Sequence, residues 1–274
     1  MIVDLGLPTT AAAPPRRSER LAAVRDGMLG SVHSWELVTA VDGPGTRLTI
    51  FLAGCALRCL YCQNPDTWNI NRGRDTSLDD VLVLIDRYEK VMAVTGGGVT
   101  LSGGEPLLQP AFVGRIFRHC AERGIHTALD TSGFLGGWAT DELLADTSLV
   151  LLDVKSGLPA VYRKTTGREL EPTLAFGRRL ARADTAMWIR FVLVPGLTDG
   201  VDNVDEVARY AASLQTLGAG RPVQRVEILP FHQMARGKWV ELDMTYPLEN
   251  TQPPTEELVD RVRNQFRGYG LPVS

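Results

Sequence analysis

The sequence predicts an α/β fold in which parallel strands form a sheet that curls toward a barrel. Short apolar, β-branched runs alternate with longer amphipathic runs, as in repeated strand–helix units. Six such units follow one another from about residue 35, with no linker that would divide the chain. Polar or glycine-rich segments follow the strands, where parallel α/β folds place their chemistry. A flat, doubly wound sheet is compatible with the same pattern.

Each element follows from local composition. Apolar, β-branched runs predict strands at 47–52, 98–101, 126–129, 149–154, 188–194 and 225–229. Amphipathic periodicity predicts helices at 78–91, 111–123, 141–145, 173–182, 203–217 and 255–269. Ser77, followed by two aspartates, is expected to cap the first of these helices. Cys120 falls in the second helix and is expected to be a small buried apolar residue.

The first thirty residues differ from the rest of the chain. A stretch rich in threonine, alanine and proline at 9–15 is followed by four arginines, and interspersed acidic residues argue against a transit peptide. We expect residues 1–30 to form a largely disordered extension with a short helix near 19–25. Residues 31–274 are expected to form one folded domain.

Composition excludes several classes of protein. The hydrophobic fraction of 44% and the charged fraction of 22% are those of an ordinary globular chain. A net charge of −3 gives no bias toward nucleic acid or anionic membranes. No apolar run approaches the roughly 20 residues that span a bilayer. We therefore expect neither a nucleic-acid nor a membrane partner, and a cytoplasmic location because reduced thiols persist there.

Three of the four cysteines lie within eight residues, in the C-x3-C-x2-C sequence of Cys55, Cys59 and Cys62. Thiolates crowded into one loop favour an iron–sulfur cluster. Three ligands leave one iron of a 4Fe–4S cluster open, as a reactive site requires. The alternatives are a zinc site completed by a distant histidine, although no second ligand pair is present, and a thiol-redox loop.

Charged residues at strand ends form the second group of candidates. Asp130 and Asp153 each end an apolar run, where a carboxylate can bind an amine, a hydroxyl or a cation but can also simply cap a helix. Lys155 is a candidate ion-pair partner for them. Arg190 lies inside an apolar run and needs a carboxylate or a ligand. His232 follows the last strand and fits a structural role as well as a ligand contact.

Together these segments resemble the radical S-adenosylmethionine (SAM) superfamily, and within it the pyruvate formate-lyase activating enzymes. The resemblance covers nearly all of the chain after residue 35. The matching segments, in order, are DGPGTR (42–47), FLAGCALRCLYCQNPDTW (51–68), GGGVTLSGGEPLLQ (96–109), ALDTSGF (128–134), LVLLDVK (149–155), WIRFVLVPGLTD (188–199) and ILPFHQMARGKW (228–239). The chain lacks the additional cysteines that many activases of other glycyl-radical enzymes carry. The resemblance implies an incomplete (β/α)6 barrel with a cluster at the carboxyl-end mouth of its strands.

The resemblance also implies roles for individual residues. Cys55, Cys59 and Cys62 would bind three irons of a 4Fe–4S cluster, and the methionyl part of SAM would chelate the fourth. Tyr61 and Gln63 would contact the adenine, although the family often has histidine at the position of Gln63. The remaining SAM contacts would be Gly104, Asp153, Val154, Lys155, Ser156, Gly157 and His232. A monovalent cation would be held by Asp130, Thr131, Asp153 and the backbone of Leu151. Asp42 and Arg190 are the candidates to hold the substrate peptide.

The activity that the resemblance implies is radical chemistry on another protein. A reduced cluster would cleave SAM to methionine and a 5′-deoxyadenosyl radical, which would take a hydrogen atom from a glycine of pyruvate formate-lyase. A flavodoxin-like protein is the expected electron donor, because the cluster must be strongly reducing. The enzyme is expected to be a monomer. The alternatives are activation of another glycyl-radical enzyme, modification of a different peptide, or a zinc- or cluster-stabilised binding module.

Overall fold

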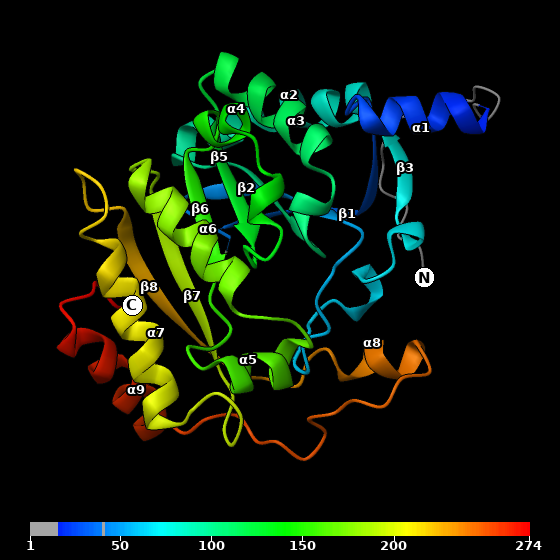
Figure 1. Cartoon of the computed structure of the whole chain (residues 1–274). Helices are drawn as coiled ribbons and strands as arrows, with labels where there is room; N and C mark the ends of the chain where they lie inside the picture. Colours follow the sequence, from blue (N-terminus) through cyan, green and yellow to red (C-terminus); the bar gives the residue numbers. More distant parts are fainter. Residues whose placement is uncertain (1–15, 40–41) are drawn as a thin grey trace. The chain divides into compact units, whose positions relative to one another are not determined.

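The computed structural model describes residues 16–39 and 42–274 of the chain. They form two compact units, and each contains parallel strands. The first unit comprises the described part of 1–55 together with 69–130 and 138–149, and the second comprises 56–68, 131–137 and 150–274. Strands and helices alternate along most of the chain (Figure 1), so the predicted α/β class is confirmed.

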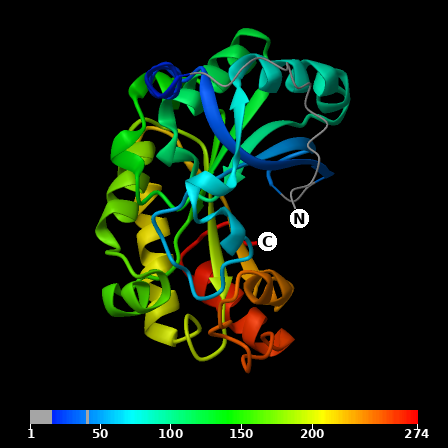
Figure 2. The same ribbon diagram turned by 90° about the vertical axis from the view of Figure 1, so that its right-hand side faces the viewer.

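The described residues of the first unit form five strands in the order β3–β1–β2–β4–β5. Strand β1 is antiparallel to both of its neighbours and runs beside β3 (Figure 2), whereas β2, β4 and β5 are parallel. Along the chain the strands are β1 (Leu29–Thr39), β2 (Thr46–Leu52), β3 (Arg74–Ser77), β4 (Gly98–Gly103) and β5 (His126–Thr131). The sequence pattern gave no bounds for β1 and β3, because both mix polar and apolar residues without a clear period of two.

Helices in the described part of the first unit are α1 (Arg17–Arg25), α2 (Leu78–Thr95), α3 (Pro110–Glu122) and α4 (Asp141–Ala145). The predicted cap of α2 is confirmed, because the Ser77 hydroxyl accepts a hydrogen bond from the Asp80 amide at 3.1 Å. Cys120 is fully buried on α3, as predicted. Short 3-10 turns cover Ile70–Arg72, Pro106–Leu108 and Gly136–Trp138.

The predicted N-terminal extension falls partly outside the described residues, since 1–15 are not among them. Helix α1 covers the region in which a short helix was expected, and β1 begins at Leu29. The division of the chain at residue 30 stays a prediction.

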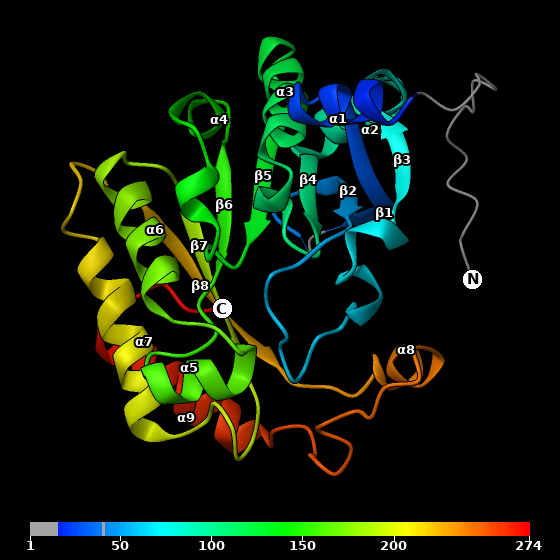
Figure 3. The same ribbon diagram turned by 45° about the vertical axis from the view of Figure 1, so that its right-hand side comes forward.

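The second unit is built on three parallel strands, β6 (Leu149–Asp153), β7 (Met187–Leu193) and β8 (Val223–Pro230). Helices α6 (Glu171–Arg182) and α7 (Val201–Leu214) cover one face of this sheet (Figure 3). Helix α9 (Glu256–Gly268) packs on the sheet through Phe266, whose ring centroid lies 6.0 Å from that of Phe191. The remaining helices are α5 (Pro159–Thr166) and α8 (Arg236–Glu241), with a 3-10 turn at Pro65–Thr67.

The six predicted strands correspond to β2, β4, β5, β6, β7 and β8, with ends that agree to within two residues. Across 16–39 and 42–274, the strands of neither unit close into a ring, which agrees with the predicted incomplete barrel. Among the described helices, none has the length and hydropathy that crossing a bilayer requires.

Candidate functional site

The cysteine loop, residues 55–62, has no regular secondary structure, so its backbone amides need partners elsewhere. The amides of Arg58 and Leu60 donate to the carbonyls of Thr166 and Thr165, at 2.8 and 3.0 Å. These carbonyls lie at the end of α5, where a helix leaves its last four carbonyls without intrahelical donors. The Cys62 amide closes a turn on the Cys59 carbonyl at 3.1 Å. Helix α5 therefore anchors the middle of the loop.

Helix α8 and the segment before it hold the other end of the loop. The Trp239 indole donates to the Cys62 carbonyl at 3.1 Å, and the side-chain amide of Gln63 donates to the His232 carbonyl at 3.3 Å. The Trp239 ring also meets the edge of Trp68, with centroids 5.2 Å apart. Residues about 170 positions away in the sequence thus contact the carbonyl of the third cysteine and the side chain that follows it.

Three of the predicted contacts meet beside the second cysteine. The Lys155 ammonium lies 2.5 Å from an Asp153 carboxylate oxygen and 5.7 Å from the centre of the Tyr61 ring. Burial alone would lower the pKa of Lys155, but the charge of Asp153 and its hydrogen bond, together with Tyr61 and Cys59, outweigh burial and raise that pKa well above its ordinary value. The expected ion pair between Lys155 and a strand-end aspartate is therefore present.

The second cysteine is protonated when no metal is bound. Burial raises the pKa of the Cys59 thiol to about 12, even though the charge of Lys155 opposes the shift. A metal that binds here must displace the proton, as thiolate ligation requires. Cys55 and Cys62 are partly exposed, and all three thiols are free of disulfides.

The residues fit a 4Fe–4S cluster with three protein ligands and a bound small molecule. Such a cluster distributes its thiolates over three irons, so the thiols need not converge on one point. Within 16–39 and 42–274, no three histidine, cysteine, aspartate or glutamate side chains form a site for a single ion. The Tyr61 hydroxyl is buried and has no hydrogen-bond partner among the described residues, so a ligand could supply one.

Hydrogen bonds to the Asn203 side chain hold the segment after β6. The Asn203 side-chain oxygen accepts from the Ser156 hydroxyl at 2.6 Å and from the Gly157 amide at 3.0 Å. A side chain at Gly157 would meet Glu206 at 2.5 Å, so α7 approaches this backbone closely. Val154 and Leu151 are fully buried. Of the predicted SAM contacts here, Asp153 and Lys155 keep partly accessible side chains.

Asp153, Arg190 and Glu227 occupy paired positions on β6, β7 and β8, so their side chains share one face of the sheet. An Arg190 nitrogen lies 3.7 Å from a Glu227 oxygen, with side-chain exposures of 12% and 15%. The carboxylate that the buried guanidinium requires is therefore Glu227, which the sequence pattern did not identify.

The predicted site residues of the first unit form hydrogen bonds with other residues of that unit. The Gly104 amide donates to the Leu52 carbonyl at 2.8 Å, and the Asp130 carboxylate accepts from the Ser102 hydroxyl at 2.6 Å. The carboxylate of Asp42, which is buried, accepts from the Thr49 hydroxyl at 3.2 Å. At Gly103 φ is +110°, and a Cβ would lie 2.4 Å from Leu52 backbone atoms, so only glycine fits this approach.

All four predicted groups have members in both units. The first unit holds one member of each group, whereas the other members belong to the second unit. These members of the first unit are Cys55 of the cluster ligands, Gly104 of the SAM contacts, Asp130 of the cation ligands and Asp42 of the peptide contacts. The four groups as wholes therefore stay predictions. Within the second unit, the structure brings together Cys59, Tyr61, Asp153 and Lys155, and separately Cys62, Gln63 and His232.

Trp239 and Tyr246, both near the third cysteine, were missed by the sequence analysis. The only signal available was the position of a tryptophan soon after His232, in the segment GKW, and nothing local related it to the cysteines.

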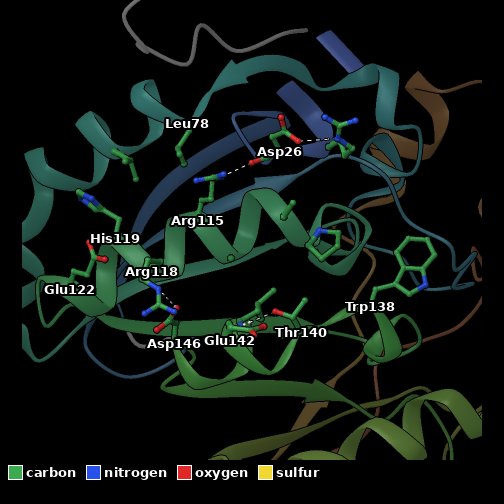
Figure 4. A pocket seen from close by; sticks show the side chains of 16 residues that line it. Asp26, Leu78, Arg115, Arg118, His119, Glu122, Trp138, Thr140, Glu142 and Asp146 are labelled. Carbon is green, nitrogen blue, oxygen red and sulfur yellow. Dashed lines mark hydrogen bonds and ion pairs between the residues drawn. The ribbon is translucent and has the colours of Figure 1, made fainter. Parts of the chain in front are cut away.

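A separate groove of about 690 Å³ lies in the first unit, between α2, α3 and α4 (Figure 4). Side chains of both charges line the groove, and several of them pair with neighbours: Arg118 pairs with Asp146 at 3.0 Å, and Arg115 donates to the Asp26 carbonyl. None of the sequence-predicted site residues lines this groove.

Comparison with known proteins relates this arrangement to one family. Residues 49–211 match the radical SAM superfamily. The chain is 38% identical over 248 residues to pyruvate formate-lyase 1-activating enzyme of Escherichia coli K12, covering 90% of this chain and 98% of the relative. It is 41% identical over 253 residues to pyruvate formate-lyase-activating enzyme of Staphylococcus epidermidis, covering 89% and 98%. A radical SAM methyltransferase from Sphaerobacter thermophilus superposes with a TM-score of 0.58 at 18% identity, covering 96% and 81%, and shows the same fold.

Proposed function

The chain belongs to the radical SAM superfamily, and we propose that it generates the glycyl radical of pyruvate formate-lyase. The observation that carries this proposal is the similarity to two activating enzymes from different bacteria over nearly the whole length of each. A module that merely contained a cluster would not require similarity over about nine tenths of the chain.

We propose that Cys55, Cys59 and Cys62 ligate the cluster. These thiolates would hold a cluster that, once reduced by an external donor, would supply one electron to the sulfonium of bound SAM; cleavage of the C5′–S bond would release methionine and leave a C5′ radical able to take the glycine hydrogen atom. The chain supplies the surroundings for this chemistry. The anchored cysteine loop fixes the ligands, and the Asp153–Lys155 pair places a charged group beside Cys59 and Tyr61.

The adenine and the amino-acid part of SAM need contacts of different chemistry. We propose Tyr61 and Gln63 for the adenine, since a buried ring and an amide offer stacking and hydrogen bonds. Gly104, Asp153 to Gly157 and His232 are proposed for the rest of SAM. Asp130, Thr131, Asp153 and Leu151 are proposed for a cation, and Asp42 and Arg190 for the peptide.

The electron donor that we propose is a flavodoxin-like protein, and the proposed compartment is the cytoplasm, where thiols stay reduced. We further propose that the enzyme acts as a monomer.

The decisive experiment is anaerobic incubation of the reconstituted, reduced protein with SAM and pyruvate formate-lyase, followed by electron paramagnetic resonance. We expect a glycyl-radical signal together with 5′-deoxyadenosine. Production of 5′-deoxyadenosine without a glycyl radical would point to another glycyl-radical enzyme or peptide. A colourless protein that retains one zinc ion would overturn the proposal.

Replacing Cys59 with alanine tests the ligand assignment. We expect Cys59→Ala to abolish SAM cleavage, because the cluster loses one of three thiolates. Cys120→Ala is the matched control: this buried thiol lies on α3, outside the loop, and its loss is expected to leave cleavage intact. Cleavage by Cys59→Ala at the wild-type rate would refute the assignment.

A further inference from the structure

Gln109 carries a buried side-chain amide that is bonded to the main chain of two distant segments. The residue joins the 3-10 turn Pro106–Leu108 to α3. Its Oε1 accepts from the Ser31 amide at 2.7 Å, and its Nε2 donates to the carbonyls of Ser31 and Ala53, each at 3.0 Å. A glutamine amide offers two donor hydrogens and an acceptor oxygen, and here all of them are used. None of the roles proposed above involves this side chain.

The bonds of Gln109 replace strand pairing where β2 ends. The last pair that β1 makes with β2 joins Val32 to Leu52. Ser31 and Ala53 lie beyond that pair and are buried, so their backbone groups need partners other than the ladder of the sheet. The Gln109 amide supplies them, and thereby ties β1 to the residue that follows β2.

The backbone held by this amide leads directly into the cysteine loop. Gly54 is the one residue between Ala53 and Cys55, and its carbonyl accepts from the Glu105 amide at 2.8 Å. At Gly54 φ is +97°, which favours glycine at this bend. Segment 105–109 thus fixes both residues that connect β2 to the first cysteine, and all of these residues belong to the first unit.

We infer that Gln109 is a positioning residue for Cys55, because by holding Ala53 it fixes the backbone that presents the first thiol to the cluster. The inference rests on the proposed function, since it takes Cys55 to be a ligand. Cys59 and Cys62 belong to the second unit, where α5 and α8 anchor them. The first thiol needs an anchor of its own. Contacts that orient a ligand in this way strengthen metal binding, although they do not touch the metal.

The test is the alkylation rate of each cysteine in the reduced apoprotein of Gln109→Met, measured by mass spectrometry of its peptides. Methionine is also unbranched but has no amide, so the Ser31 amide and the Ala53 carbonyl lose their partner. We expect Cys55, which is partly exposed, to react roughly fivefold faster, because a backbone that has lost such a hydrogen bond opens more often. Cys62, which is also partly exposed, should react at the wild-type rate.

Gln215→Met is the matched control. Oε1 of Gln215 accepts from the Val223 amide at 3.3 Å, and its Nε2 donates to the Val223 carbonyl at 2.7 Å, at the start of β8. The control therefore removes the same kind of bond from another strand, and Cys55 should be alkylated at the wild-type rate. The reconstituted proteins give a second readout: Gln109→Met should lose iron to a chelator faster than the wild type, and Gln215→Met should not.

A milder variant, Gln109→Asn, keeps the inference testable if Gln109→Met does not fold. Asparagine retains the amide but is one methylene shorter, so it cannot span Ser31 and Ala53 together, and Cys55 should again react faster. Equal acceleration of Cys55 and Cys62 would indicate a general loosening and overturn the inference, as would acceleration of neither. These rates are measured without a cluster, so the inference can fail while the proposed function stands. A wild-type protein that assembles no 4Fe–4S cluster would overturn both.

Discussion

Arg47 is a fully buried cation whose described hydrogen bonds go to uncharged groups. Its guanidinium donates to the Thr100 hydroxyl and the Val99 carbonyl, each at 2.6 Å, and burial lowers its pKa to about 10. Another of its nitrogens lies 3.3 Å from Nδ1 of His126. Because a guanidinium can only donate, this contact requires a neutral imidazole as acceptor. Arg47 thus links the 42–47 turn, which contains Asp42, to β4 and β5.

His126 should make the stability of the protein depend on pH. Burial, and then the charge of Arg47, lower the pKa of His126 to about 4, whereas an unfolded chain protonates histidine near 6.5. The unfolded state therefore binds more protons between these values, and the free energy of unfolding should fall as the pH falls from 6.5 to 4. His126→Gln, which keeps an acceptor, should flatten this part of the curve in urea titrations. An equally steep decline in the variant would contradict the assignment.

At the scale of elements, the two short helices α5 and α8 hold the cysteine loop. Neither was among the helices predicted from the sequence, although the five-residue helix α4 was. Isolated helices of this length are marginal in water. Here their stability comes from packing and from the loop itself, since loop amides occupy the last carbonyls of α5 and the α8 indole donates to the loop. Helix and loop stabilise each other.

Removing the hydrogen bond from α8 to the cysteine loop should speed the loss of iron from the cluster. Trp239→Phe removes the donor to the Cys62 carbonyl while keeping an aromatic ring against Trp68. One hydrogen bond contributes about 1 kcal/mol. We therefore expect the reconstituted variant to lose iron to a chelator roughly fivefold faster, if the bond holds the ligand in place.

The control for this prediction is Trp138→Phe. Trp138 is 53% exposed and lies in the first unit, away from the cysteine loop in sequence. The rate of iron loss from this variant, measured by the absorbance of the cluster, should match that of the wild type. Equal rates in all three proteins would show that the indole does not hold the loop.

At the scale of the whole molecule, the core does not depend on the cluster. Each unit buries large aromatic side chains among its own helices and strands, Phe112 and Phe117 in the first and Phe191 and Phe266 in the second. The backbone of the cysteine loop is bonded to protein groups and not only to a metal. This differs from small zinc domains, in which the metal supplies the folding energy.

The apoprotein should accordingly be folded. We expect iron-free protein to melt cooperatively in circular dichroism, and the anaerobically reconstituted protein to melt at a higher temperature, because a ligand that binds only the native state stabilises it. An apoprotein without a cooperative transition would contradict this view and indicate that the cluster is needed to assemble the fold.

The sequence by itself determined the features that depend on local pattern. The parallel strands were predictable because buried strands are continuous apolar runs bounded by glycine and polar residues, as at β4 and β6. The cap at Ser77 and the burial of Cys120 follow from a few neighbouring residues. The iron–sulfur chemistry was predictable because its three thiols lie within eight residues of one another.

Only the tertiary structure decided which residues surround those thiols. The Trp239 indole is 177 positions from the carbonyl that it meets, and Glu227 is 37 positions from Arg190, so no periodicity relates them. Short helices such as α5 and α8, and the polar strand β3, form because distant segments satisfy their backbone and side chains. Local composition encodes the elements and the ligand atoms, whereas the packing of remote segments fixes the hydrogen bonds and charges around them.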